Sequence, residues 1–132
     1  MHLITAQLKL IMLITGALTC TMAYALVAPQ AALLSMFGEA LPDSPLMHIV
    51  VRSWGMLITL LGAALIYGAF NPAVRPLVLT LAGLSKLVFV GLLILLGGQY
   101  LPKTLTPILI DGLAVILYAI CLPRARREAA AI

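Results

Sequence analysis

The chain has 132 residues and a formal net charge of +4, and 64% of its residues are hydrophobic against 9% charged. A soluble domain is about 45–50% apolar and about 25% charged, so this composition excludes an ordinary soluble protein and indicates an integral membrane protein. Four spans of about 20 residues use about 80 residues and leave too few for a separate extramembrane domain, so residues 1–132 are expected to form one membrane domain.

Prolines divide the chain into four apolar runs, at about residues 8–28, 47–70, 77–97 and 105–122. Backbone groups in lipid must be paired within the chain, and this chain is too short for a closed barrel, so each run is expected to be a helix. The first run exceeds the 7–15-residue core of a cleaved signal, so it is expected to remain as a span. The predicted fold is an all-α, four-helix transmembrane bundle.

A short helix is predicted between the first two runs. Pro29 suits the first turn of a helix and Gly38 suits its end, so the helix is expected to cover residues 29–37. It is expected on the outer surface of the membrane, packed on the bundle or buried among the headgroups, with an interaction role as the alternative.

Small residues form faces on which helices can approach closely. On the second helix Gly55, Thr59 and Gly62 recur at three- and four-residue steps after Arg52. Gly16 lies on a similar strip of the first helix. We therefore expect these faces to pack within the bundle.

Three charged residues, Arg52, Lys86 and Asp111, lie inside the apolar runs. Each costs a few kcal/mol near the bilayer centre unless it is paired or hydrated. Arg52 and Asp111 lie at similar depths, about 8 and 9 Å from the outer helix ends, and both side chains lean outward, so they are expected to form an ion pair. Lys86 is expected to face the interior, either joining that pair or turning toward Tyr118.

The surroundings of these charges also contain small residues, since Gly83 lies one turn before Lys86 and Ala114 one turn after Asp111. This pattern predicts that the charged faces meet inside the bundle. Two interpretations remain open: an ion-pair cluster that fixes helix register, and a polar cavity that binds a ligand.

Basic residues near the helix ends predict the orientation. Five of them, Lys9, Arg75, Arg124, Arg126 and Arg127, fall on one side, and Lys103 falls on the other. Positively charged loops remain in the cytoplasm, so both termini are expected there, as in a multi-pass protein of a cell inner membrane.

Several functional classes lack their signatures. The histidines, His2 and His48, lie near helix starts and not within the spans, so no haem is expected, and no other cofactor is predicted. The two cysteines form no CxxC motif, the first helix lacks the acid of small four-helix drug exporters, and no nucleophile–base pair supports an enzyme. Glu39, Asp43 and His48 are spaced too irregularly for a metal site and are expected to be solvated.

The layout resembles small four-span bacterial membrane proteins of the DoxX-like and BphX-like kind. The resemblance is carried by the turn at Phe37 and Gly38, the acidic link over residues 42–45, and the Val-Arg-Ser-Trp-Gly segment at residues 51–55. It implies a bacterial inner-membrane accessory protein, and it carries over no catalytic residue.

Two functions are therefore predicted. The first is an accessory or structural subunit that binds partner helices through its small-residue faces, as a homo-oligomer or within a membrane complex, with no role in nucleic-acid binding. The alternative is a binder or carrier of a small polar, anionic or lipid-like molecule that uses Arg52, Lys86 and Asp111. The two differ in whether the interior around Lys86 is sealed or contains a cavity.

Overall fold

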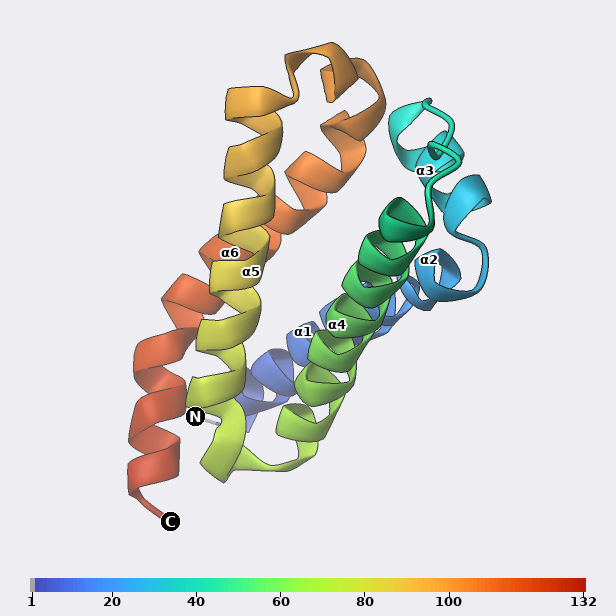
Figure 1. Cartoon of the computed structure of the whole chain (residues 1–132). Coiled ribbons are helices and arrows are strands. Elements are labelled where there is room, and N and C mark those ends of the chain that lie inside the picture. The colour runs from blue at the N-terminus through green and yellow to red at the C-terminus, as the bar shows by residue number, and fades with distance from the viewer. Residues whose placement is uncertain (1) are drawn as a thin grey trace.

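The computed structural model describes residues 2–132, with side chains from Ala6 onward, so the side chain of His2 lies outside the described part. This part is all-helical, as Figure 1 shows. In chain order the elements are α1 (His2–Cys20), α2 (Ala23–Val27), α3 (Pro29–Phe37), α4 (Pro45–Phe70), η1 (Pro72–Val74), α5 (Arg75–Leu96), η2 (Gly98–Tyr100) and α6 (Leu101–Ala130).

Four helical segments are long and apolar enough to cross a membrane: Ala6–Val27, Pro45–Phe70, Pro72–Leu96 and Gly98–Ala130. They coincide with the four apolar runs of the sequence. The predicted all-α fold with four potential spans is therefore confirmed.

The first segment is not the single helix expected over residues 8–28, because it turns at Thr21 and Met22, between α1 and α2. The amides of Thr21 and Met22 bond the carbonyls three residues earlier, at 3.2 and 3.1 Å, and the Thr21 hydroxyl donates to the Leu18 carbonyl at 2.5 Å. Short-range bonds of this kind compete with the regular α-helical pattern. The first span is therefore divided into α1 and α2.

The fourth helix is longer than the run predicted at residues 105–122. Helix α6 continues through Pro107 and Pro123 to Ala130. Each proline removes one backbone hydrogen bond, but neighbouring bonds and packing can maintain the helix. After Pro123 that packing comes from Ala125, which is fully buried, and from Glu128, which pairs with Arg75.

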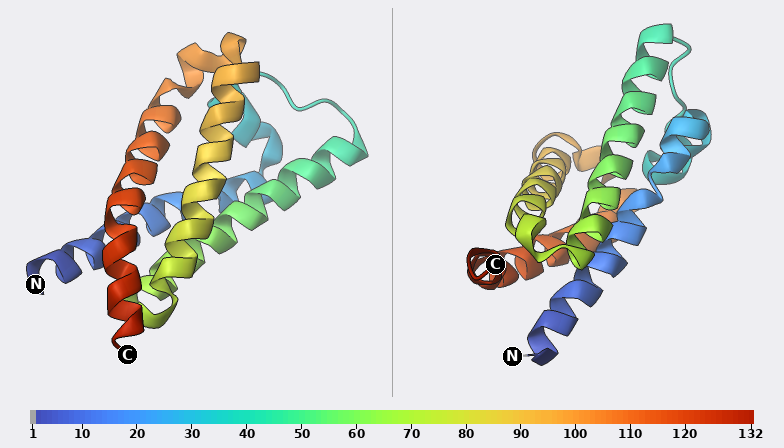
Figure 2. Two further views of the ribbon diagram at one scale, coloured as in Figure 1. Left: turned by 90° about the vertical axis from the view of Figure 1, so that its left-hand side faces the viewer. Right: turned by 90° about the horizontal axis from the view of Figure 1, so that it is seen from below.

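The short helix α3 agrees with the sequence prediction, since it begins at Pro29 and ends at Phe37. Gly38, which follows it, has a left-handed backbone conformation (φ 74°). Its far end contacts the turn between α5 and α6: the Phe37 and Tyr100 rings meet edge to face at 5.6 Å, and the Tyr100 hydroxyl donates to Glu39 at 2.7 Å. The α3–α4 loop then spans from this turn to the start of α4 (Figure 2). Helix α3 therefore links the two halves of the bundle at this end.

The bundle has two halves, α1, α2 and α4 in one and α5 and α6 in the other (Figure 1). In the first half α1 and α4 meet at Gly16 and Gly62, where a Cβ on Gly16 would lie 2.9 Å from the Gly62 carbonyl oxygen. The two halves are close at the α4–α5 turn and diverge toward the opposite end, as both figures show. Both termini lie at the end where the halves are close.

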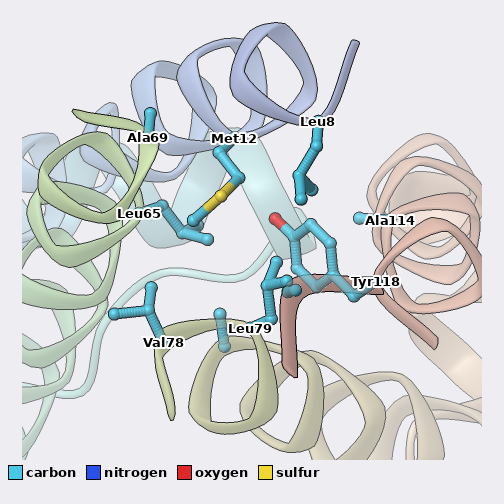
Figure 3. Packing of buried hydrophobic residues seen from close by; sticks show 10 residues of the cluster. Leu8, Met12, Leu65, Ala69, Val78, Leu79, Ala114 and Tyr118 are labelled. Atoms are coloured by element: carbon cyan, nitrogen blue, oxygen red, sulfur yellow. The ribbon is translucent and has the colours of Figure 1, made fainter. Parts of the chain in front are cut away.

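We call the end with the termini and the α4–α5 turn the closed end. Its core joins residues from α1, α4, α5 and α6, and Figure 3 shows Met12 and Leu8 of α1 facing Leu65, Leu79 and Tyr118. Apolar contacts between all four spans therefore seal this end of the bundle.

Arg75 completes the closed end, and the sequence suggested no such structural role. It is 3% exposed, and its guanidinium donates to the carbonyls of Gly68 and Ala69 at 2.9 and 2.6 Å and to Glu128 at 3.1 Å. The two carbonyls belong to the last turn of α4, whose acceptors lack the regular i+4 donor; the Gly68 carbonyl also accepts from the Asn71 amide, at 3.2 Å. Arg75 thus caps α4 and connects it to the last turns of α6.

Candidate functional site

Lys86 of α5 and Asp111 of α6 form an ion pair at 2.9 Å between Nζ and Oδ1. The lysine side chain is 14% exposed and the carboxylate 20%, so both face the interior more than the surface. Lys86 also donates to the hydroxyl of Thr19 on α1, at 3.2 Å. One ammonium group therefore joins three of the four spans.

Two threonines of α1, one turn apart, are oriented to accept hydrogen bonds. Thr15 donates its hydroxyl proton to the Ile11 carbonyl at 2.8 Å, and Thr19 donates to the Thr15 carbonyl at 2.6 Å. A hydroxyl has one proton, so each oxygen keeps only lone pairs for the interior. This face of α1 thus suits a protonated lysine.

Tyr118 extends this polar cluster toward the closed end. Its hydroxyl donates to the Thr15 hydroxyl oxygen at 2.6 Å. In Figure 3 the phenol oxygen points from α6 toward α1, near Met12 and Leu8. Lys86 and Tyr118 thus bond neighbouring threonines of one helix and do not bond each other.

The predicted pair of Arg52 with Asp111 is wrong. Arg52 is exposed and donates through Nη1 to the Leu26 carbonyl at 3.2 Å, whereas the Asp111 carboxylate pairs with Lys86. Helix α2 packs against α4 beside Arg52, so the Leu26 carbonyl is within reach of the guanidinium. Leu26 lies in the last turn of α2, where carbonyls lack helical donors and favour a cation.

The predicted packing residues occupy different environments. Gly55 lies against α2, where an added Cβ would be 2.9 Å from the Ala25 methyl. A Cβ added at Gly62 would be 2.8 Å from the Cys20 backbone nitrogen. Thr59 donates to the Gly55 carbonyl at 2.7 Å. Ala114 is buried in the core. Gly83 has more room, since its nearest neighbour, the Tyr118 ring, would be 3.7 Å from a Cβ.

A cavity of about 500 Å³ lies between the diverging halves, and Thr15, Thr19, Lys86 and Asp111 form part of its wall. Its wall includes residues of all four spans, α2 and α3, and most of it is apolar. Among the described residues that line it, Lys86 and Asp111 are the charged ones. A cavity of this size with a few polar groups at one place is typical of a small-molecule site.

A groove continues from this cavity between α4 and α5. The cavity and the groove share five lining residues, Trp54, Ile58, Leu61, Ser85 and Phe89. Trp54 and Phe89 line both, and their rings contact each other with centroids 6.2 Å apart. Beyond them the groove is lined by exposed leucines and Val88, so it opens on the side surface of the bundle.

Sequence reasoning missed Thr15 and the pairing of Arg75 with Glu128. The spacing of Thr15 and Thr19, four residues apart in an apolar helix, was a usable signal for one polar face. No group of three or more metal-binding side chains gathers among residues that the structure describes, and Glu39 accepts a bond from Tyr100.

Comparison of the chain with protein-family models, with curated proteins and with solved structures gave no match.

Proposed function

We propose that this integral membrane protein binds a small amphipathic molecule in the cavity between its two halves. The supporting observation is that an ion pair between Lys86 and Asp111 lines a cavity of about 500 Å³ whose walls are mostly apolar. An ion pair that only fixes helix register needs no adjacent space, whereas a cavity of this size with a few polar groups at one place is typical of a small-molecule site. A bound molecule accounts for the cavity.

The accessory role expected from the small-residue faces has less support. Gly16, Gly55 and Gly62, which suggested surfaces for partner helices, pack against helices of this same chain. A partner or a second copy would have to use other surfaces. Membership of a membrane complex and the likeness to DoxX-like and BphX-like proteins therefore remain proposals that rest on the sequence.

Cellular placement is likewise part of the proposal. Lys9 lies over the Phe70 ring at 4.4 Å, and Arg75 pairs with Glu128, so these basic residues belong to the closed end. By the positive-inside rule this end lies in the cytoplasm, and the cavity is nearer the outer face of a bacterial inner membrane. We propose a binding or carrier role, because the Lys86 ammonium is paired with Asp111 and the Thr19 hydroxyl that it contacts donates its own proton to the Thr15 carbonyl.

Native mass spectrometry of protein released from membranes in mild detergent tests the binding role. We expect wild-type protein to retain a small-molecule adduct, and Lys86→Met to lose it. Lys103→Met is the matched control, because Lys103 is exposed and does not line the cavity. Absence of any adduct from the wild type, or equal retention by Lys86→Met, contradicts the proposal.

A further inference from the structure

The charges in the cavity restrict what its ligand can be. Lys86 and Asp111 neutralise each other, and no other charged side chain of the described residues lines the cavity. A charged headgroup would add an uncompensated charge to apolar surroundings or displace one partner of the pair, and both are unfavourable. The cavity therefore favours an uncharged headgroup.

Hydrogen-bonding groups remain available at the same place. The Lys86 ammonium has three donors and uses two, for Asp111 and Thr19. The second carboxylate oxygen of Asp111 can accept another bond, and the Ser85 hydroxyl makes no bond to the protein within the part that the structure describes. A hydroxyl or carbonyl group can thus bind without breaking the ion pair.

The groove between α4 and α5 suits the remainder of such a molecule. Its wall is formed almost wholly by apolar side chains, among them the exposed Leu57, Val88 and Leu92. Both helices are long and apolar enough to span a membrane, so this opening faces lipid. Leu92 lies six residues beyond Lys86 on α5, so the groove extends about 9 Å from the ion pair along the helix.

We infer that the ligand is a lipid-soluble amphiphile with an uncharged, oxygen-bearing head at Lys86 and Asp111, and an apolar tail that lies along Trp54 and Phe89 in the α4–α5 groove. The molecule reaches the cavity sideways from the bilayer. This inference rests on the proposed function and specifies the class of molecule that the same cavity binds.

The single tryptophan, Trp54, provides the measurement, because bromine quenches indole fluorescence at contact. Three probes with the same brominated long chain carry an alcohol, a sulfonate or a quaternary ammonium head. We expect saturable quenching by the alcohol at a mole fraction about tenfold lower than by either charged probe, which corresponds to about 1.4 kcal/mol. Lys86→Met leaves the Asp111 carboxylate unpaired and should abolish the preference for the alcohol over the quaternary ammonium probe.

Quenching from the surrounding detergent or lipid needs its own control. In the double variant Trp54→Phe/Leu87→Trp the indole moves to an exposed position that lines neither the cavity nor the groove. Its quenching should rise without saturation and equally for all three probes. If no probe quenches Trp54 differently from this control, the proposed function fails. If a charged probe binds best, the inference fails and the binding function stands.

A pair of variants tests the path of the tail. Val88→Phe narrows the groove, and Leu87→Phe adds the same bulk at the neighbouring position outside it; both residues are exposed, at 59% and 53%. Val88→Phe should weaken quenching by the long-chain alcohol several-fold and leave a short-chain brominated alcohol unaffected, and Leu87→Phe should change neither. Equal binding of the long-chain alcohol to both variants removes the groove from the proposal.

Discussion

The closed end and the cavity both form where the same four spans meet, but they are filled differently. At the closed end Leu8, Met12 and Leu65 are almost completely buried, and Arg75 makes hydrogen bonds to two carbonyls and a carboxylate. At the cavity Lys86 and Asp111 retain partial exposure and unused hydrogen-bonding capacity. Packing at one end holds the bundle together while the other end stays open.

This contrast separates stability from binding within one small chain. Changes at the closed end should reduce the free energy of unfolding strongly, because its groups are buried and fully bonded. Changes at the cavity should reduce stability less and affect binding more. Four sets of variants test this difference.

The largest loss is expected from Arg75→Gln. Removing a guanidinium from a buried ion pair that also caps a helix should lower the free energy of unfolding by about 3 kcal/mol. The measurement is unfolding by a harsh detergent in mixed micelles, followed by circular dichroism. Arg126→Gln is the control, because Arg126 is exposed on the same end of the chain. Similar losses for the two variants contradict the role of Arg75 in closing this end.

The next effect is expected from Gly62→Ala. Its new methyl would lie 2.8 Å from the Cys20 backbone, so α1 and α4 must separate, at a cost of about 2 kcal/mol in the same assay. Gly91→Ala makes the matched comparison, since nothing lies within 4 Å of that position. It should be neutral or slightly stabilising, because alanine favours helix more than glycine does. Equal stability of both variants would show that the close approach of α1 and α4 is not required.

At the cavity, Lys86→Met and Asp111→Asn should each cost about 1–2 kcal/mol, less than a fully buried pair because both groups are partly exposed. The double variant should lose less than the sum of the two single losses, since it leaves no uncompensated charge. A double-mutant cycle measures this coupling. Strictly additive losses would mean that the pair contributes no coupling energy.

The smallest effect is expected from Tyr118→Phe, which removes one hydroxyl between the closed end and the cavity. Loss of its bond to Thr15 should cost about 1 kcal/mol, the usual net value of one hydrogen bond. Tyr24→Phe, at an exposed ring, should change stability by less than about 0.5 kcal/mol. Thermal unfolding of both variants measures the difference. If Tyr118→Phe is as stable as the wild type, Tyr118 contributes to stability through its ring and not through its hydroxyl.

The architecture was largely predictable from the sequence. Long apolar runs can only be helices in lipid, and Pro29 with Gly38 was enough to locate α3. The break at Thr21 was not predictable from hydropathy, because threonine is tolerated in apolar helices and the turn depends on hydroxyl bonds to the backbone. The continuation of α6 past Pro123 depends on tertiary contacts of Ala125 and Glu128, which a local pattern does not contain.

The two charged members of the polar site, Lys86 and Asp111, were predictable from the sequence, and their pairing was not. Lys86 and Asp111 stood out as charges within apolar runs, and the prediction that Lys86 faces the interior agrees with its low exposure. Similar depth and outward lean favoured Arg52 as the partner of Asp111. Neither quantity gives the direction in which a side chain points around its helix axis, so the prediction was wrong. The position of α2 decided the matter by presenting the Leu26 carbonyl to Arg52.

The two prolines inside α6 have a mechanical consequence. Pro107 and Pro123 have no amide proton to donate to the carbonyls of Lys103 and Ala119, respectively. The helix therefore bends most easily at these two positions. Asp111 and Tyr118 both lie on the stiff segment between them. The end of α6 near α3 or the end that carries Glu128 can then tilt by bending at the nearer proline. In either case the Asp111 carboxylate and the Tyr118 phenol keep their mutual spacing, because the segment between the prolines moves as one rigid helix.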